Sequence, residues 1–115
     1  MNGIAKDFDP TKKPKQREFK IEDYLINQVE KIGGKCYKWV APGCDGVPDR
    51  IVMFKGCVIF VETKRPKGKP RLLQKIRHKE LQKQGMLTAV ADTKLEVDSL
   101  VATLVSKGLS NDRNC

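Results

Sequence analysis

The stretch that most constrains the fold is residues 47–64. Two apolar runs rich in β-branched and aromatic residues, residues 51–54 and 58–61, flank a short break at Lys55-Gly56-Cys57. This pattern is typical of an antiparallel β-hairpin. If Lys55 and Gly56 form the turn, Phe54 faces Cys57 and Ile51 faces Phe60.

The same register brings charged residues together at the open end of the hairpin. Asp49 then faces Glu62, and like charges repel when they are directly opposed, because the Cβ atoms are only roughly 4.5–5.5 Å apart. Side chains alternate along a strand, so Lys64 shares the face of Glu62 and Thr63 points away from it. Two carboxylates beside an amine predict a metal site. The alternative is that Asp49 only caps a turn and that Glu62 and Lys64 are solvated.

Both faces of the hairpin are largely apolar. Val52, Phe54, Ile59 and Val61 share one face, whereas residues such as Met53 and Phe60 share the other. A hairpin of this kind is expected to lie in the middle of a sheet that is covered on both sides. Charged residues in such a place are rare unless they are paired or bind a metal.

These residues also carry a family resemblance. Pro48-Asp49 followed by Glu62-Thr63-Lys64 resembles the PD-(D/E)XK nuclease pattern. The chain is similar in particular to the small stand-alone phage and bacterial members of the VRR-NUC family, over about residues 18–98. The matching positions are Gly33-Gly34, Tyr37-Lys38, Pro42-Gly43, Gly46-Val47-Pro48-Asp49-Arg50, Phe60-Val61-Glu62-Thr63-Lys64 and Gln74.

The resemblance implies phosphodiester hydrolysis that depends on Mg²⁺ or Mn²⁺. Asp49, Glu62 and the backbone carbonyl of Thr63 offer the oxygen ligands that such ions prefer. In the family a helical glutamate completes the metal shell, and its spacing before the glycine pair matches Glu22 better than Glu18. Lys64 is expected to orient or deprotonate the attacking water, or to neutralise the charge on the phosphorus.

Three further residues near the expected site are Gln74, Asp45 and Thr63. The resemblance places Gln74 at the border of the active site, where its amide could hold a water or a phosphate oxygen. Asp45 is close enough in sequence to compete as a ligand. The family usually has an aliphatic residue where this chain has Thr63, and we expect this difference to affect packing only.

Charge points to a polyanionic partner. The 115 residues hold 23 Lys and Arg against 14 Asp and Glu, a formal charge of +9. This balance favours DNA over a membrane surface. We expect a cytoplasmic protein, in the host cell if it is phage-encoded, because no signal peptide or membrane span is evident. The four cysteines form no CxxC pair, so we expect free thiols and no zinc site.

Periodicity predicts the remaining elements. Helices are expected over residues 18–32, 70–84 and from about residue 93, and strands over residues 35–40 and 86–91. The order αβββαβα predicts an α/β, restriction-endonuclease-like fold with a mixed sheet of about four strands flanked by helices. We divide the chain into a basic flexible arm (residues 1–17), a nuclease domain (18–107) and a polar tail (108–115).

The most basic part of the chain follows the hairpin. Nine Lys or Arg and one acid, Glu80, lie between Lys64 and Lys83. Apolar residues at helical spacing, Leu72, Leu73, Ile76 and Leu81, are expected to form the buried side of the helix, and His78 is expected at the surface. The residues expected to bind DNA phosphates are Lys38, Lys67, Lys69, Arg71 and Lys75, although a solvated basic helix face is the alternative.

Three functions are compatible with these residues. The first is a structure-selective DNA endonuclease that resembles Holliday-junction resolvases and acts on branched DNA as a homodimer. The second is a nuclease of the same fold directed to flaps, nicks or DNA ends. The third is a DNA-binding module without catalytic activity. The paired carboxylates Asp49 and Glu62 beside Lys64 argue against the third.

Overall fold

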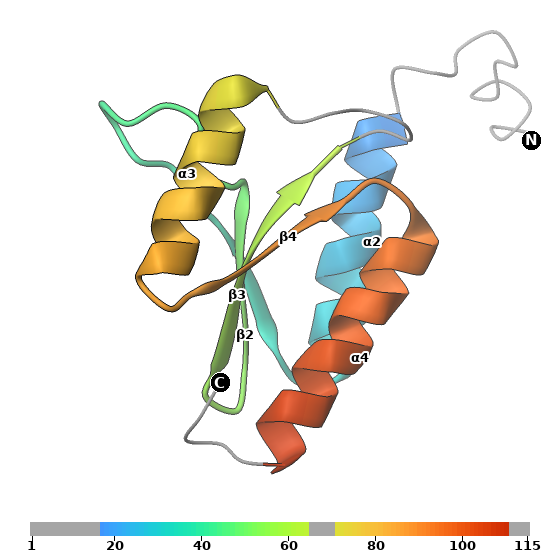
Figure 1. Ribbon diagram of the computed structural model, residues 1–115. Helices are drawn as coiled ribbons and strands as arrows, with labels where there is room; N and C mark the ends of the chain where they lie inside the picture. Colours follow the sequence, from blue (N-terminus) through green and yellow to red (C-terminus); the bar gives the residue numbers. More distant parts are fainter. Residues whose placement is uncertain (1–16, 65–70, 111–115) are drawn as a thin grey trace, which may run out of the picture.

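The protein is an α/β structure in which helices flank a four-stranded mixed sheet. The computed structural model describes residues 17–64 and 71–110 (Figure 1). The order αβββαβα expected from the sequence is confirmed. The elements are α2 (Arg17–Lys31), β1 (Lys35–Lys38), β2 (Arg50–Phe54), β3 (Cys57–Thr63), α3 (Leu72–Lys83), β4 (Leu87–Ala91) and α4 (Lys94–Ser110).

The predicted hairpin forms the centre of the sheet. The strand order is β1-β2-β3-β4, and Phe54 pairs with Cys57 and Ile51 with Phe60, as the sequence predicts. Lys55 and Gly56 both have positive φ angles, 46° and 87°. Two such residues make the type I′ turn whose twist matches that of the flanking strands. β4 pairs parallel to β3 after the crossover through α3.

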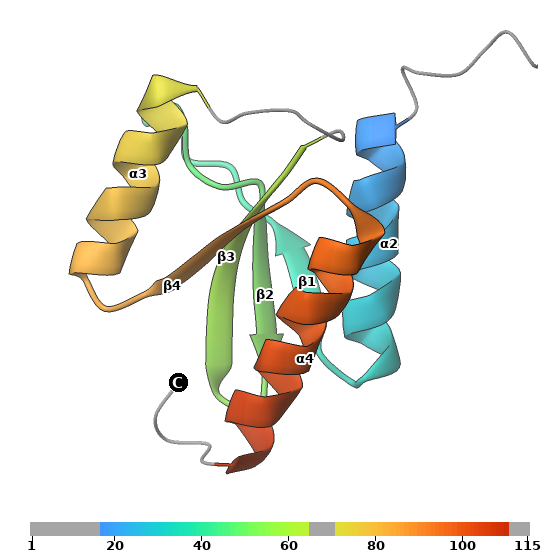
Figure 2. The same cartoon turned by 45° about the vertical axis from the view of Figure 1, so that its right-hand side comes forward.

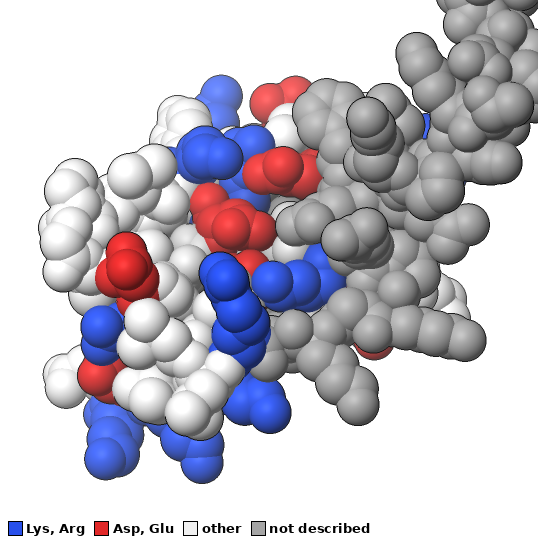
Figure 3. All heavy atoms as spheres, turned by 90° about the horizontal axis from the view of Figure 1, so that it is seen from above, with Lys and Arg blue, Asp and Glu red and all other residues white. Residues whose placement is uncertain are grey.

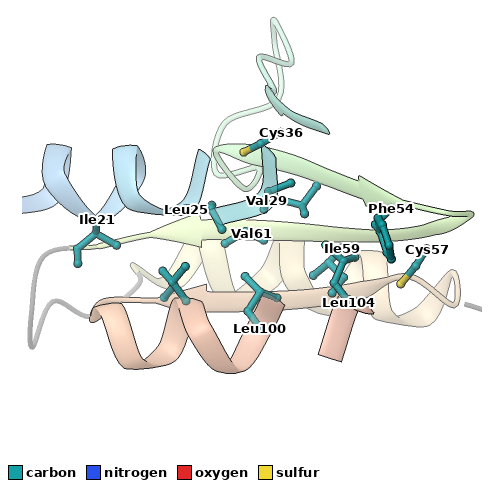
Figure 4. Packing of buried hydrophobic residues seen from close by; sticks show 13 residues of the cluster. Ile21, Leu25, Val29, Cys36, Phe54, Cys57, Ile59, Val61, Leu100 and Leu104 are labelled. Atoms are coloured by element: carbon teal, nitrogen blue, oxygen red, sulfur yellow. The ribbon is translucent and has the colours of Figure 1, made fainter. Parts of the chain in front are cut away.

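One face of the sheet carries the hydrophobic core. Helices α2 and α4 lie together on this face, and α3 lies on the opposite one (Figures 1 and 2). Alternation along β2 and β3 directs Val52, Phe54, Ile59 and Val61 to the α2–α4 face, where they are buried. Figure 4 shows Phe54, Ile59 and Val61 packed with apolar side chains of the two helices, among them Leu25, Val29, Leu100 and Leu104.

The other face is less completely covered than the sequence predicts. Ile51, Met53, Val58 and Phe60 point to this side and are only half-buried. α3 packs against β4 at one edge of the sheet, so the α3 side of the hairpin is only partly covered. Trp39 covers part of this side, because its ring lies 5.1 Å from that of Phe60.

The orientation of α3 about its own axis differs from the prediction. Leu72, Leu73 and Ile76 are exposed, and the residues buried against the sheet are Gln74 and His78. Leu81 is half-buried. The expectations of a buried leucine stripe and of a surface histidine are therefore wrong. The physical reason is a hydrogen bond of Gln74 to a buried carboxylate of β3, described below.

Three smaller findings complete the fold. The first strand ends at Lys38, and α4 continues to Ser110, beyond the domain boundary expected at residue 107. Cys36 and Cys44 are free thiols as expected, but Cys57 is disulfide-bonded, which sequence spacing could not predict because disulfides depend on spatial proximity. Within the described ranges, no helix is long and apolar enough to cross a membrane.

Candidate active site

The predicted charged residues meet at the end of the sheet where β2 begins and β3 ends. Asp49 directly precedes β2, Glu62 and Thr63 end β3, and Lys64 follows. This end lies at the top of Figure 1, close to the first turns of α2 and α3. Seen from above in Figure 3, acidic side chains gather in the middle of the face, with Lys and Arg beside them.

Asp49 is held by hydrogen bonds from residues on both sides of β2. The backbone N–H of Trp39 donates to the Asp49 carbonyl at 2.7 Å. The Asp49 Oδ2 atom accepts hydrogen bonds from the Thr63 backbone N–H at 3.2 Å and from the Thr63 hydroxyl at 3.0 Å. The prediction that the Thr63 side chain points away from the site is therefore wrong. Because Asp49 lies just outside β2, its side chain is free to turn toward the face that Thr63 occupies.

Glu62 is the most buried charged residue of the site. It is 2% exposed, and its Oε2 atom accepts from the Gln74 amide at 2.9 Å and lies 3.3 Å from the Lys64 Nζ atom. Its Oε1 atom is buried and has no hydrogen-bond partner among the residues that the structure describes. Burial, and next the charge of Asp49, raise the pKa of Glu62 from 4.5 to about 7, although Lys64 opposes this increase.

Gln74 connects α3 to this carboxylate. Its side chain is buried, its amide nitrogen donates to Glu62, and its amide oxygen accepts from the Arg71 backbone N–H at 2.9 Å. Both ends of the amide are therefore satisfied, which fixes the rotation of the helix. The residue predicted to border the site lies there.

The loop before β2 packs closely against the start of α3. Gly46 has φ +89°, and a Cβ atom there would lie 2.9 Å from the Leu73 Cγ atom and 3.1 Å from the Leu73 backbone, so only glycine fits. A hollow of about 410 Å³ opens beside this contact, lined by Asp45, Gly46, Arg71, Leu73 and Gln74. Exposed Lys75 lies in the helix that borders the carboxylates, and exposed Arg71 is the N-cap residue of that helix.

Glu22 takes part in an ion pair rather than in a cluster of carboxylates. Its Oε2 atom accepts from Arg50 Nε at 2.7 Å, and both side chains are largely buried. Among the side chains that the structure describes, no group of three or more His, Cys, Asp and Glu could hold a metal ion. The side chain of Glu18, the alternative to Glu22, lies outside the described residues, and the metal role of Glu22 stays a prediction.

The other predicted DNA contacts are distributed around the site. Lys38 is exposed and pairs with Arg50 in the sheet, so alternation places it on the face opposite Glu62. Lys67 and Lys69 lie outside the described residues. The side chain of Arg77 donates to the carbonyl of Asp45 at 2.8 Å and so links α3 to the loop.

Sequence reasoning missed three features of the site. The first is the ion pair of Arg50 with Glu22. Arg50 ends the family motif at residues 46–50, and a buried partner could have been expected for an arginine at the start of a central strand. The Thr63 hydroxyl was overlooked because strand alternation does not apply to Asp49. His78 is four residues after Gln74, and this spacing predicts a shared helix face, so its burial could have been inferred from that of Gln74. Within the described part of the chain the His78 Nε2 atom has no hydrogen-bond partner, and burial lowers the pKa of this residue.

The carboxylates fit a divalent cation. A buried carboxylate oxygen without a partner, Glu62 Oε1, is costly unless something satisfies it. The raised pKa of Glu62 has the same origin, since a negative charge is buried beside Asp49. Mg²⁺ and Mn²⁺ take oxygen ligands, and Mg²⁺ often needs only one or two protein carboxylates because it retains several waters.

Comparisons with known proteins agree with this geometry. "Putative nuclease p44" of Acyrthosiphon pisum secondary endosymbiont phage 1 is 46% identical over 78 residues, which cover 67% of this chain and 84% of that protein. A solved structure described as "VRR_NUC domain" matches with a TM-score of 0.71 and 30% identity, over 75% of this chain and 95% of that chain.

A second solved structure, described as "VRR_NUC domain protein", has a TM-score of 0.67 over 80% of this chain and 90% of that chain. At 19% identity, it supports the fold alone. No family profile matches the sequence. The identity to the phage protein and to the first structure extends over most of each of them, so the chain belongs to the VRR_NUC family of nucleases.

Proposed function

We propose that this protein is a metal-dependent DNA endonuclease that hydrolyses phosphodiester bonds in branched DNA, most simply four-way junctions, and that it acts as a homodimer. The observation that carries the proposal is the site itself. Glu62 is buried, one of its oxygens has no partner within residues 17–64 and 71–110, and it lies beside Asp49 and 3.3 Å from Lys64 Nζ. Family membership supports the reaction type, and the formal charge of +9 supports a nucleic-acid substrate.

Asp49, Glu62 and the carbonyl of Thr63 are the groups that would hold Mg²⁺ or Mn²⁺. Such an ion, when bound, polarises a phosphoryl oxygen and lowers the pKa of a bound water. Among the contacts described, the Thr63 hydroxyl and N–H bind only the Oδ2 atom of Asp49, and they hold the carboxylate at the end of β3, beside Glu62. Preorganised ligands reduce the cost of assembling the site during reaction.

Lys64 and Gln74 act on the same carboxylate and border the space where a phosphate would lie. The Lys64 ammonium group carries a positive charge next to Glu62. It is placed to offset the negative charge that develops around the phosphorus. The Gln74 amide holds the Glu62 carboxylate through Oε2. Arg71 and Lys75 on α3 would neutralise neighbouring phosphates, so binding should weaken steeply with salt.

The experiment that tests the reaction is cleavage of end-labelled four-way junction, flap and linear duplex with Mg²⁺, Mn²⁺ or EDTA. Wild type is compared with Asp49→Asn and Lys64→Met, and Glu30→Gln is the matched control, since Glu30 is an exposed carboxylate near the C-terminal end of α2. We expect paired, symmetric cuts in the junction that disappear with EDTA and in the first two variants only. Cutting confined to flaps or ends would retain the chemistry and change the substrate.

Two measurements without catalysis complete the test. Mg²⁺ should raise the thermal midpoint of wild type but not that of Asp49→Asn, because a ligand that binds only the folded state stabilises it. The mass in solution should be twice the 13.0 kDa of one chain. DNA binding without metal-dependent cutting of any substrate would favour a binding module, and a monomer that cuts would exclude the symmetric arrangement.

A further inference from the structure

Helix α3 presents an apolar face to solvent beside the active site. Leu72 is 73% exposed, Ile76 is 42% exposed and Leu73 is 40% exposed. Leu72 and Ile76 are four residues apart, so their side chains are neighbours on the helix surface. The helix could not bury them against the sheet, because Gln74 and His78 occupy that side.

The exposed face is flanked by positive charge. Lys75, Lys79 and Lys83 are exposed on the same helix. Its single acidic residue, Glu80, is already paired with Arg77 at 3.1 Å. A symmetric contact between two copies of α3 would bring six lysines together with no free carboxylate of this helix to offset them, whereas a DNA backbone complements them.

The apolar face also has a defined position relative to the carboxylates. Leu72 lies in the first turn of α3, two residues before Gln74, whose amide contacts Glu62. Two residues correspond to about 200° around a helix, so Leu72 projects away from Gln74, at the end of the helix nearest the site. Figure 3 shows uncharged residues next to the acidic cluster on its α3 side.

We propose that Leu72 and Ile76 form an apolar wedge that contacts the exposed base pair at a DNA branch point. Proteins that distort DNA commonly insert leucine or isoleucine between base steps, and a branch exposes the face of a base pair without prior unstacking. The lysines of α3 would hold the adjacent phosphates. The inference rests on the proposed function, because it assigns the recognition of branched DNA to this face.

The geometry also predicts where the cut falls. A helix with its side chains is about 10–12 Å wide, so the outer side of α3 lies about that distance from Glu62. One strand advances about 3.4 Å for each nucleotide. A branch point held by Leu72 therefore places the cleaved phosphate about three nucleotides away.

The test compares Leu72→Ser and the double variant Leu72→Ser/Ile76→Ser with wild type. The control is Leu95→Ser, because Leu95 is 76% exposed on α4, across the sheet from α3. Affinities for a four-way junction and a linear duplex of equal length are measured in EDTA by fluorescence anisotropy, so that no cleavage is needed. 2-Aminopurine at the branch point reports contact with the exposed base.

We expect the preference for the junction to fall about ten-fold in the double variant, the scale of one lost apolar side-chain contact. The single variant should lose part of it and Leu95→Ser none, and the 2-aminopurine signal should change with wild type and with Leu95→Ser but not with the double variant. Far-UV circular dichroism confirms that each variant is folded. In Mg²⁺, the wild-type cuts should fall about three nucleotides from the branch.

Several results would overturn the inference. An unchanged preference in a folded double variant would do so, as would a wild type that does not distinguish a junction from a duplex. Conversion of a dimer to a monomer with the preference retained would assign this face to contact between copies. If wild type prefers the junction and the double variant does not, but Mg²⁺ produces no cutting, the wedge is supported and only the proposed chemistry fails.

Discussion

Replacing Glu62 with glutamine should stabilise the metal-free protein while it removes the proposed metal ligand. The carboxylate is 2% exposed, and one of its oxygens has no hydrogen-bond partner in the described ranges. An isosteric amide removes the buried negative charge and can still accept the hydrogen bond from Gln74. We therefore predict that the Glu62 carboxylate lowers the stability of the metal-free protein, although the proposed metal site requires it.

The size of the effect follows from the raised pKa. The pKa of Glu62 is raised from 4.5 to about 7, by burial and then by Asp49. The folded state holds this proton more tightly than the unfolded state, so stability falls as pH rises through the interval between these values. At about 1.4 kcal/mol per tenfold change in proton affinity, wild type should lose about 2–3 kcal/mol relative to the variant between pH 5 and pH 8.

The assay is urea unfolding in EDTA from pH 5 to pH 8.5, followed by the fluorescence of Trp39 and by circular dichroism. Glu30→Gln is the matched control, because Glu30 is an exposed carboxylate of α2. The free energy of unfolding of Glu62→Gln should exceed that of wild type increasingly toward high pH, and that of Glu30→Gln should follow wild type. Parallel curves for wild type and Glu62→Gln would refute the argument that burial of this charge raises its pKa.

Three further predictions concern the surroundings of the site. Thr63→Val keeps the shape but removes the 3.0 Å hydrogen bond to Asp49, and should cost about 1 kcal/mol in urea unfolding and lower the cleavage rate. Arg50→Met should destabilise the protein by about 1.5–3 kcal/mol because it leaves the Glu22 carboxylate unpaired, and in a double-mutant cycle Glu22→Gln should recover part of this loss. Burial lowers the pKa of His78, so the stability of wild type should fall relative to that of His78→Leu as pH falls below 6.5; a difference that does not change with pH would contradict this account.

Much of the site could be predicted because it is encoded locally. A two-residue turn sets the register of a hairpin, and alternation then sets the face of each residue. The turn and the alternation could both be inferred from residues 47–64. The structure pairs Ile51 with Phe60 as expected and places Lys64 beside Glu62. The contact of Thr63 with Asp49 was not readable, since Asp49 lies outside the regular strand and alternation does not fix its direction.

The element order was also determined by sequence, because helices and strands leave different apolar periods. The orientation of α3 was not. Its leucines alone predict the wrong buried face, because periodicity ranks side chains by hydrophobicity and takes no account of what they pack against. Gln74 faces inward because Glu62 is buried there and needs a donor.

The sequence by itself thus determined the hairpin, its paired acids and the αβββαβα order, all of which depend on neighbours along the chain or across one turn. Tertiary structure alone decided the partners of these acids: Gln74 from α3 for Glu62, and Arg50 for Glu22. A buried charge without a hydrogen bond costs more than an exposed leucine. Polar contacts between distant segments therefore set the rotation of α3, and Leu72 and Ile76 were left in solvent as a consequence.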